Sequence, residues 1–207
     1  MSVAVLGGGL DVVNFGCRLN IAEGEAVPAA ATAAGASDTI IFNSCAVTDE
    51  AVRQARQAVR RALRERPEAN VVVTGCAAEL EGERFAALGA RVVRNDAKGL
   101  TESYGAGAPV ARSKSYSPAL SGADHARAFL GVQTGCSHSC TFCATVIARG
   151  TARSASVDAV VESASLALAR GQREIVLTGV DLASYGDDSG TTLAALIEAL
   201  LALPIER

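Results

Sequence analysis

The segment Thr39-Ile40-Ile41-Phe42-Asn43-Ser44-Cys45 decides the fold, because an apolar run there ends in small polar residues and a cysteine. Runs of branched and aromatic residues without polar alternation are typical of parallel strands that are buried on both faces. The same pattern recurs in residues 11–17 and 70–76, which end at Cys17 and Cys76. The sequence therefore predicts three strands of one kind, each followed by a thiol.

The segments between these strands predict crossover helices. Residues 21–34 and 50–66 are long and rich in alanine, as a helix that joins two parallel strands requires. Thr48 is a suitable N-cap for the second helix. A helix over 80–88 and a short strand over 91–94 follow. We therefore expect an α/β fold whose N-terminal part is a parallel β-α-β sheet.

The three cysteines that follow the strands are predicted to meet. Parallel strands point the same way, so residues just past their ends arrive at one carboxyl edge, where α/β folds assemble their sites. Cys17, Cys45 and Cys76 would then form a three-thiolate site. The alternative is three inert thiols in the core, since free cysteine is among the most buried residue types.

A second group of thiols lies in Gly135-Cys136-Ser137-His138-Ser139-Cys140-Thr141-Phe142-Cys143, with the spacing C-x3-C-x2-C. Thiolates at this density select zinc, copper(I) or iron–sulfur clusters, and a disulfide framework is not expected. A cubane cluster held by three thiolates keeps one iron open for a small molecule. The alternative is a zinc site with His138 as fourth ligand, although the tight loop leaves its ring little room to reach the same ion.

This loop resembles the cluster loop of radical S-adenosylmethionine enzymes, in which the open iron chelates the cofactor, and Phe142 matches the aromatic residue usual before the last cysteine. Further segments resemble motifs of the methylthiotransferases, most closely the branch that modifies threonylcarbamoyladenosine in tRNA. These segments are Phe15-Gly16-Cys17-Arg18-Leu19-Asn20, Asn43-Ser44-Cys45-Ala46-Val47-Thr48, Val73-Thr74-Gly75-Cys76-Ala77 and Leu177-Thr178-Gly179-Val180-Asp181-Leu182.

The resemblance implies two [4Fe-4S] clusters, one on Cys17, Cys45 and Cys76 and the other on Cys136, Cys140 and Cys143. The second would bind and reductively cleave S-adenosyl-L-methionine, with Phe142, Gly179 and Asp181 at the cofactor. For Asp181, a turn cap is the alternative. Arg149 and Arg153 also match family positions, for which solvated arginines are the alternative.

The implied reaction is insertion of a methylthio group at C2 of N6-threonylcarbamoyladenosine-37 in tRNA. It would require a reductant such as flavodoxin or ferredoxin and a sulfur donor. Methylthiolation of isopentenyladenosine in tRNA or of a ribosomal protein remains an alternative within the class. A non-catalytic iron–sulfur module is the alternative outside it.

The domain organisation is predicted from composition and periodicity. Residues 1–100 would form the sheet domain, and residues 101–125, rich in Ser, Gly, Ala and Pro, a linker. Residues 126–207 predict a strand over 128–133, a helix over 157–170, a strand over 174–178 and a helix over 191–203. This is enough for only the first βα units of the partial TIM barrel that the resemblance implies, with no strand after residue 178, so we expect a C-terminally truncated chain.

Charge and hydropathy add few constraints. The formal net charge of −3 gives no general attraction for nucleic acid, so tRNA contact requires a local patch. An arginine stripe over residues 53–64 could bind phosphates or be a solvated helix face. Gly7-Gly8-Gly9 is interpreted as a flexible tail rather than a phosphate loop. No segment is suited to span a membrane or to direct secretion, so we expect a cytoplasmic protein.

Overall fold

The fold is described from a computed structural model, which covers residues 9–105, 115–122, 127–138 and 140–207. Of the glycine run 7–9, only Gly9 lies inside these ranges, and part of the predicted linker lies outside them. The N-terminal part contains β1 (Leu10–Asn14), α1 (Arg18–Gly24), α2 (Ala26–Ala33), β2 (Thr39–Ser44), α3 (Asp49–Glu65), β3 (Asn70–Gly75), α4 (Cys76–Ala87), β4 (Arg91–Val92) and the 3-10 turns η1 (Asn95–Ala97) and η2 (Thr101–Ser103).

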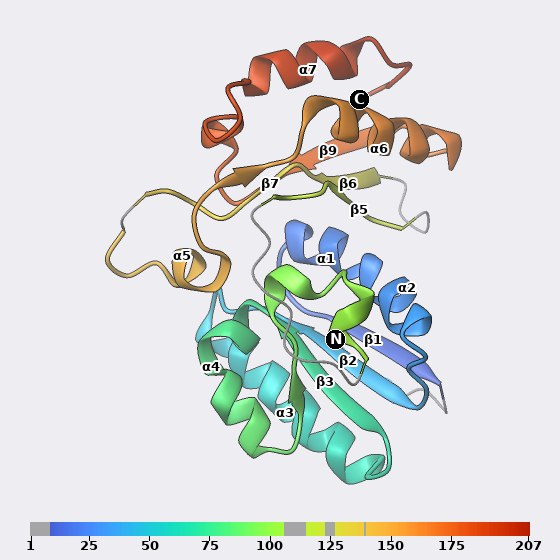
Figure 1. The fold of residues 1–207 in the computed structure, drawn as a ribbon, viewed down its shortest axis with the longest axis vertical. Coiled ribbons are helices and arrows are strands. Elements are labelled where there is room, and N and C mark those ends of the chain that lie inside the picture. The colour runs from blue at the N-terminus through green and yellow to red at the C-terminus, as the bar shows by residue number, and fades with distance from the viewer. Residues whose placement is uncertain (1–8, 106–114, 123–126, 139) are drawn as a thin grey trace.

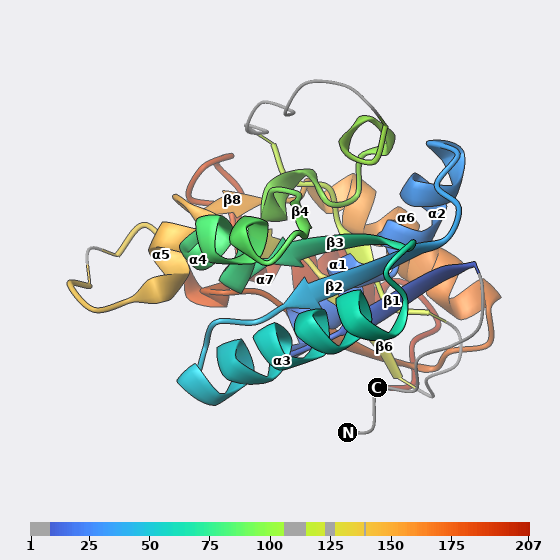
Figure 2. The same cartoon turned by 90° about the horizontal axis from the view of Figure 1, so that it is seen from below.

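The N-terminal part is a parallel four-stranded sheet in the order β1-β2-β3-β4. Alternate residues of each strand face opposite layers. Phe42 and Val73 pack with α3 and α4, whereas Ile41 and Val72 pack with α2. Figure 1 shows the sheet between these helical layers, and Figure 2 shows β1, β2 and β3 side by side with α3 running along them. The predicted α/β fold with strands buried on both faces is confirmed.

The C-terminal part is built on a second, smaller sheet. Its elements are β5 (Ala119–Leu120), β6 (Arg127–Gly131), β7 (Gln133–Thr134), α5 (Ala144–Arg149), β8 (Arg153–Ser154), α6 (Val157–Ala169), β9 (Glu174–Thr178), the 3-10 turn η3 (Leu182–Ser184) and α7 (Leu193–Leu201). Strands β6 and β9 are parallel, and β5 adds to β6 in the antiparallel sense. Strands β7 and β8 form a separate antiparallel pair. A barrel stays a prediction.

The two parts pack against each other through α1 (Figure 1). The guanidinium of Arg18 lies 5.6 Å from the ring centre of Phe129 in β6. A Cβ atom at Gly131 would come within 2.8 Å of Leu19 Cδ1, so the strand and the helix are in close contact. The carboxyl ends of the N-terminal strands therefore lie near the loop that carries the second cysteine group.

The predicted helices mostly form where the sequence places them. Threonine or serine N-caps begin α3, α6 and α7, with Thr48 Oγ1 accepting from the Ala51 amide at 3.1 Å. The single helix expected over 21–34 is two helices, because the chain turns at Glu25. Helix α4 begins at Cys76, directly after β3, instead of at residue 80.

Two details of the C-terminal part differ from the sequence-based expectations. Residues 119–120 of the predicted linker form β5, and the single strand expected over 128–133 breaks at Val132 into β6 and β7. The outer edge of β9 is partly covered, because Arg207 accepts from the Ile175 amide and donates to the Arg173 carbonyl. This parallel pattern shows that backbone pairing continues beyond β9.

Candidate metal and cofactor sites

Three thiols from separate strand ends line one cavity in the N-terminal part. Cys17 caps α1, Cys45 follows β2, and Cys76 is the first residue of α4. They share the lining of a cavity of about 160 Å³. A single water needs roughly 10–15 Å³ of such space, so the cavity can hold a group of several atoms. The structure thus brings the three predicted thiols together, and their role as metal ligands stays a prediction.

Two glycines allow this close approach. Gly16 and Gly75 each precede a cysteine and have φ values of +99° and +89°. A Cβ atom at Gly16 would lie 2.4 Å from Cys45 Cβ, and one at Gly75 would lie 2.2 Å from the Ser44 carbonyl oxygen. Only glycine fits both the left-handed backbone and the short distance. The sequence Gly-Cys at these strand ends is therefore a requirement of the site's geometry.

The alternative of three inert core thiols does not account for Cys17. Cys45 and Cys76 are buried, but Cys17 is exposed beside the cavity. All six cysteines of the chain are free thiols. An exposed thiol gains nothing from core packing, so the arrangement favours ligand chemistry.

A buried lysine ties the strand ends to one another. Lys98 Nζ donates to Asn20 Oδ1 at 2.8 Å and to Asn43 Oδ1 at 3.1 Å, and it pairs with Glu23 Oε2 at 2.8 Å. Its side chain is only 4% exposed. Three acceptors therefore satisfy the three protons of the ammonium group.

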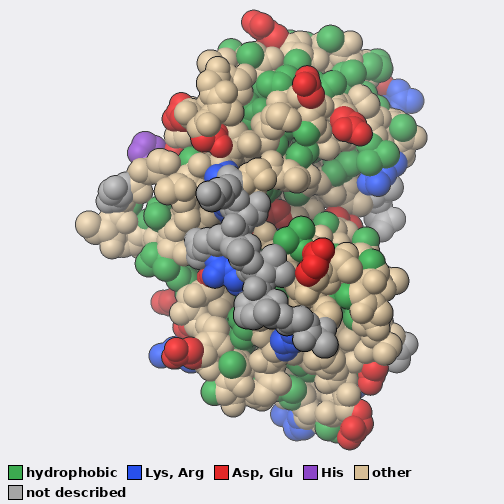
Figure 3. All heavy atoms as spheres, in the orientation of Figure 1, with side chains coloured by type: hydrophobic (Ala, Val, Ile, Leu, Met, Phe, Trp, Pro, Cys, Tyr) green, Lys and Arg blue, Asp and Glu red, His purple; other side chains and the backbone are tan. Residues whose placement is uncertain are grey.

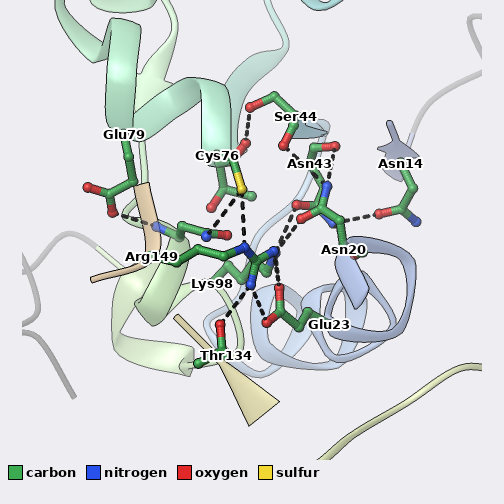
Figure 4. Close-up of polar contacts among 12 residues, drawn as sticks. Asn14, Asn20, Glu23, Asn43, Ser44, Cys76, Glu79, Lys98, Thr134 and Arg149 are labelled. Carbon is green, nitrogen blue, oxygen red and sulfur yellow. Dashed lines mark hydrogen bonds and ion pairs between the residues drawn. The ribbon is translucent and has the colours of Figure 1, made fainter. Parts of the chain in front are cut away.

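Asn20 transfers this anchoring to the backbone before two of the cysteines. Its Nδ2 donates to the carbonyl oxygens of Phe15 at 2.7 Å and Ser44 at 3.2 Å. These carbonyls lie just before Cys17 and Cys45. The hydrogen bonds of Asn20 therefore hold the ends of β1 and β2 in register with each other (Figure 4).

The third cysteine is contacted by Arg149, which comes from the C-terminal part. Its Nε donates to Cys76 Sγ at 3.3 Å, and its two terminal nitrogens donate to the Glu23 carboxylate at 2.8 and 3.0 Å. Its Nη1 also donates to Thr134 Oγ1 at 2.9 Å. Figure 4 shows the guanidinium between Cys76 and Glu23. The alternative of a solvated Arg149 is wrong, because its side chain is 3% exposed.

Burial and charge oppose each other in this network. Burial works against ionisation of Glu23, but Lys98 and Arg149 hold the pKa of this carboxyl at about 2. Burial lowers the pKa of Lys98, and Glu23 partly offsets that effect. Burial raises the pKa of the Cys76 thiol, against the pull of the neighbouring Arg149 and Lys98 cations. The network is thus a set of compensated buried charges.

The second cysteine loop is anchored at its first cysteine. The Cys136 amide donates to the Gly150 carbonyl at 3.0 Å. Gly135 has a φ of +72°, and a Cβ atom there would lie 2.0 Å from the Thr151 carbonyl oxygen. The loop therefore begins in close contact with the backbone that follows α5.

Cys136 also belongs to a polar cluster that the sequence did not predict. Its thiol donates to Asp181 Oδ2 at 3.7 Å, and His138 Nε2 lies 3.1 Å from the same oxygen. The three potential ligand atoms lie within 4.8 Å of one another. The His138 ring thus lies near Cys136, and the expectation that it has little room to reach an ion shared with the three cysteines stays a prediction. His138 is 69% exposed, and Figure 3 shows a histidine side chain at the surface.

The remaining loop residues face solvent to different degrees. Cys140 is exposed, Cys143 is half-buried, and Phe142 is 92% exposed. The hydroxyl and amide of Thr145 and the amide of Val146, in the first turn of α5, lower the pKa of Cys143. These hydrogen bonds favour the thiolate form of Cys143 more than in an ordinary cysteine, and the thiolate is the form that binds metals.

Asp181 serves a structural role as well. It precedes η3, and its carboxylate accepts from Ser184 Oγ at 2.7 Å, which lowers its pKa together with His138 and Cys136. The turn-cap alternative thus has direct support, and the predicted contact with a cofactor stays a prediction.

Gln133 is a site residue that sequence reasoning missed. Its Oε1 accepts from the amides of Val180 and Asp181 at 2.9 Å each, and its Nε2 donates to the Gly135 carbonyl at 2.8 Å. Gln133 is fully buried, and a Cβ atom at Gly179 would lie 3.0 Å from its Oε1. One side chain therefore joins the cysteine loop to the end of β9. The signal available was a glutamine at the end of an apolar run.

The chain is similar in sequence to known proteins. Residues 10–93 match the model of the uncharacterized protein family UPF0004. The chain is 35% identical over 205 residues to the threonylcarbamoyladenosine tRNA methylthiotransferase MtaB of Rickettsia prowazekii, covering 93% of this chain and 49% of the relative. It is 34% identical to the MtaB of Chlamydia pneumoniae, covering 100% and 51%, and 31% identical to that of Bacillus subtilis, covering 84% and 44%.

This chain is similar, over most of its own length, to threonylcarbamoyladenosine tRNA methylthiotransferases. The predicted resemblance is confirmed. The relatives of the chain are named as methylthiotransferases, which are enzymes. The chain spans about half the length of these curated relatives. Within the described part of the chain, all helices are too short or too polar to cross a membrane.

Proposed function

We propose that this chain is part of a tRNA methylthiotransferase that uses radical S-adenosylmethionine chemistry to insert a methylthio group at C2 of N6-threonylcarbamoyladenosine-37. The observation that carries the proposal is the placement of Cys17, Cys45 and Cys76 around one cavity, adjoined by α5 of the second cysteine loop. The names of the relatives support tRNA as the substrate class.

The donor sets fit the proposed cofactors. Each group offers three free thiols, which suits a cubane cluster with one open iron. When bound, such clusters supply reductive cleavage of S-adenosyl-L-methionine and a sulfur carrier. The protein contributes orientation: Gly16 and Gly75 permit the approach of the upstream thiols, and Gln133 fixes the loop at Gly135. Phe142, Gly179 and Asp181 would contact the cofactor from the loop and the end of β9.

Binding of the acceptor tRNA would require a basic surface, and the arginines on α3 do not form an unpaired basic patch. In the arginine stripe on α3, Arg53 pairs with Glu50 and Arg56 with Glu81. Figure 3 shows basic and acidic side chains interspersed on the visible face. We therefore favour the solvated-face interpretation of the stripe. We expect most tRNA contacts to come from regions of the curated relatives beyond the half that this chain matches.

The test uses the chain reconstituted anaerobically with iron and sulfide, with dithionite as reductant. We expect reduced protein to convert S-adenosylmethionine to 5′-deoxyadenosine, and to do so slowly, because further walls of the cofactor site would come from the rest of the family length. A chain extended to that length should methylthiolate hypomodified tRNA, measured by mass spectrometry of its nucleosides. A flavodoxin or ferredoxin should replace dithionite.

The alternatives give different results in the same assays. An electron-transfer module would bind iron without cleaving S-adenosylmethionine. Modification of isopentenyladenosine or of a ribosomal protein, with threonylcarbamoyladenosine unchanged, would move the proposal to another substrate. Stoichiometric zinc retained under anaerobic purification would favour the alternative zinc site, in which His138 is the fourth ligand beside the three loop cysteines.

A further inference from the structure

Arg149 connects the two cysteine groups through a single side chain. It ends α5, the helix that begins immediately after Cys143, and its Nε donates to Cys76 Sγ across the boundary between the two parts. Its other nitrogens are held by Glu23 and Thr134. With four hydrogen bonds on a planar group, the direction of the Nε–H bond toward the sulfur is fixed.

The buried set around Arg149 carries one more positive than negative charge. Arg149 and Lys98 carry two positive charges, and Glu23 carries one negative charge. Burial of an unpaired charge is costly, so an anion in contact with the surplus positive charge would be stabilised. The sulfur of Cys76 is in that position, at 3.3 Å from Arg149 Nε. A metal-bound thiolate at Cys76 would therefore place its negative charge against the Arg149 guanidinium.

We propose that Arg149 is a positioning residue for the upstream site, which holds the Cys76 thiolate toward the cavity and raises the reduction potential of the iron–sulfur cluster bound there. The proposal rests on the proposed function only in requiring that Cys17, Cys45 and Cys76 hold such a cluster.

The physical reason is the change in charge on reduction. A cluster that gains one electron becomes more negative, and part of that charge resides on its cysteine sulfurs. A hydrogen bond to sulfur and a nearby cation stabilise the reduced form more than the oxidised form, which raises the potential. The electron would come from the external reductant and remain on the cluster. Arg149 would keep its proton and act only through its charge and its hydrogen bond.

The experiment isolates the upstream cluster in the full 207-residue chain. Cys136, Cys140 and Cys143 are replaced by Ala, the chain is reconstituted anaerobically, and the cluster is titrated with dithionite while its electron paramagnetic resonance signal is recorded. In this background, we expect Arg149→Gln to lower the ratio of reduced to oxidised cluster at a given potential by about tenfold, a shift of about 59 mV for one electron. The spectrum should also change shape.

Three variants separate this effect from general damage. Arg64→Gln removes an equal charge from an exposed position on α3 and should leave the potential unchanged. Arg149→Lys keeps the charge without the planar fork and should give an intermediate potential. Thr134→Val removes one acceptor of Arg149, keeps all charges and should cause a smaller shift in the same direction.

The outcomes distinguish the two proposals. A parent chain that binds no iron at the upstream site contradicts the proposed function. If the parent chain binds iron and the Arg149→Gln and Arg64→Gln variants have the same cluster reduction potential, the proposed role of Arg149 is overturned. If Arg149→Gln does not fold, unchanged potentials in Arg149→Lys and Thr134→Val overturn it instead.

Discussion

The two cysteine groups differ in how far the folded chain prepares them. The upstream thiols stand at the ends of buried parallel strands, and the side chains of Asn20 and Lys98 fix the surrounding backbone. The downstream loop is anchored at Gly135 and Cys136, whereas Cys140 and Phe142 are exposed. The difference shows that a thiolate site can be positioned either by a sheet or by a short loop with close cysteine spacing. Four predictions test this comparison.

The largest effect is expected at Glu23, which balances both buried cations. Glu23→Gln leaves Lys98 and Arg149 without their carboxylate, and removal of one partner from a buried pair costs about 3–5 kcal/mol. The pKa of Glu23 is about 2 in the folded chain, against 4.5 for an ordinary glutamate. Its contribution is therefore complete above about pH 4.5 and is lost as the pH falls toward 2. Urea denaturation across this range should show a flatter pH dependence in the variant.

Glu50 provides the matched control for Glu23. A hydrogen bond from Arg53 also holds the pKa of Glu50 at about 2, but both side chains are more than half exposed. Solvent screens such a pair, so Glu50→Gln should change the stability little. Equal losses in the two variants would contradict a special role for the buried network.

The next largest effect is expected at Gly75. In Gly75→Ala the new methyl group would meet the Ser44 carbonyl, so the end of β3 must shift, and we expect a loss of about 3 kcal/mol together with reduced iron at the upstream site. Gly35→Ala is the control, because Gly35 has a similar φ of +76° and nothing within 4 Å of its would-be Cβ. It should lose only about 1–2 kcal/mol. Similar losses would show that crowding at the strand end is unimportant.

Iron content compares the two groups directly. The reconstituted chain should bind about eight irons, and replacement of either set of three cysteines by Ala should leave about four. The downstream triple variant should keep most of its folding stability, since none of its three cysteines is buried. Loss of all iron in one triple variant would mean that the sites depend on each other.

The smallest change in stability is expected at Phe142. Its ring is 92% exposed, so Phe142→Ala should alter the free energy of unfolding by less than about 0.5 kcal/mol. If the ring contacts the cofactor, the same variant should weaken S-adenosylmethionine binding, measured by equilibrium dialysis. A stability loss comparable with that of Gly75→Ala would mean that the downstream loop is also part of the core.

The sequence by itself determined the parallel sheet, because branched apolar runs separated by helical segments have few other folded arrangements. It also determined that Cys17, Cys45 and Cys76 approach each other, since parallel strands end at one edge. The N-termini of α3 and α6 also depend on local sequence, because each is capped by a hydrogen bond between one hydroxyl and an amide three residues later.

Only the tertiary structure decided which polar residues support these thiols. Glu23, Lys98 and Arg149 are far apart in the sequence, and each alone is typical of a solvated surface. Likewise, the sequence shows Gln133 only as one polar residue at the end of an apolar run. In the structure, its side-chain amide joins the end of β9 to the cysteine loop. Burial of a charge or an amide is stable only when partners from other elements arrive at hydrogen-bonding distance. That condition is set by packing between the two parts of the chain, and local sequence patterns do not contain it.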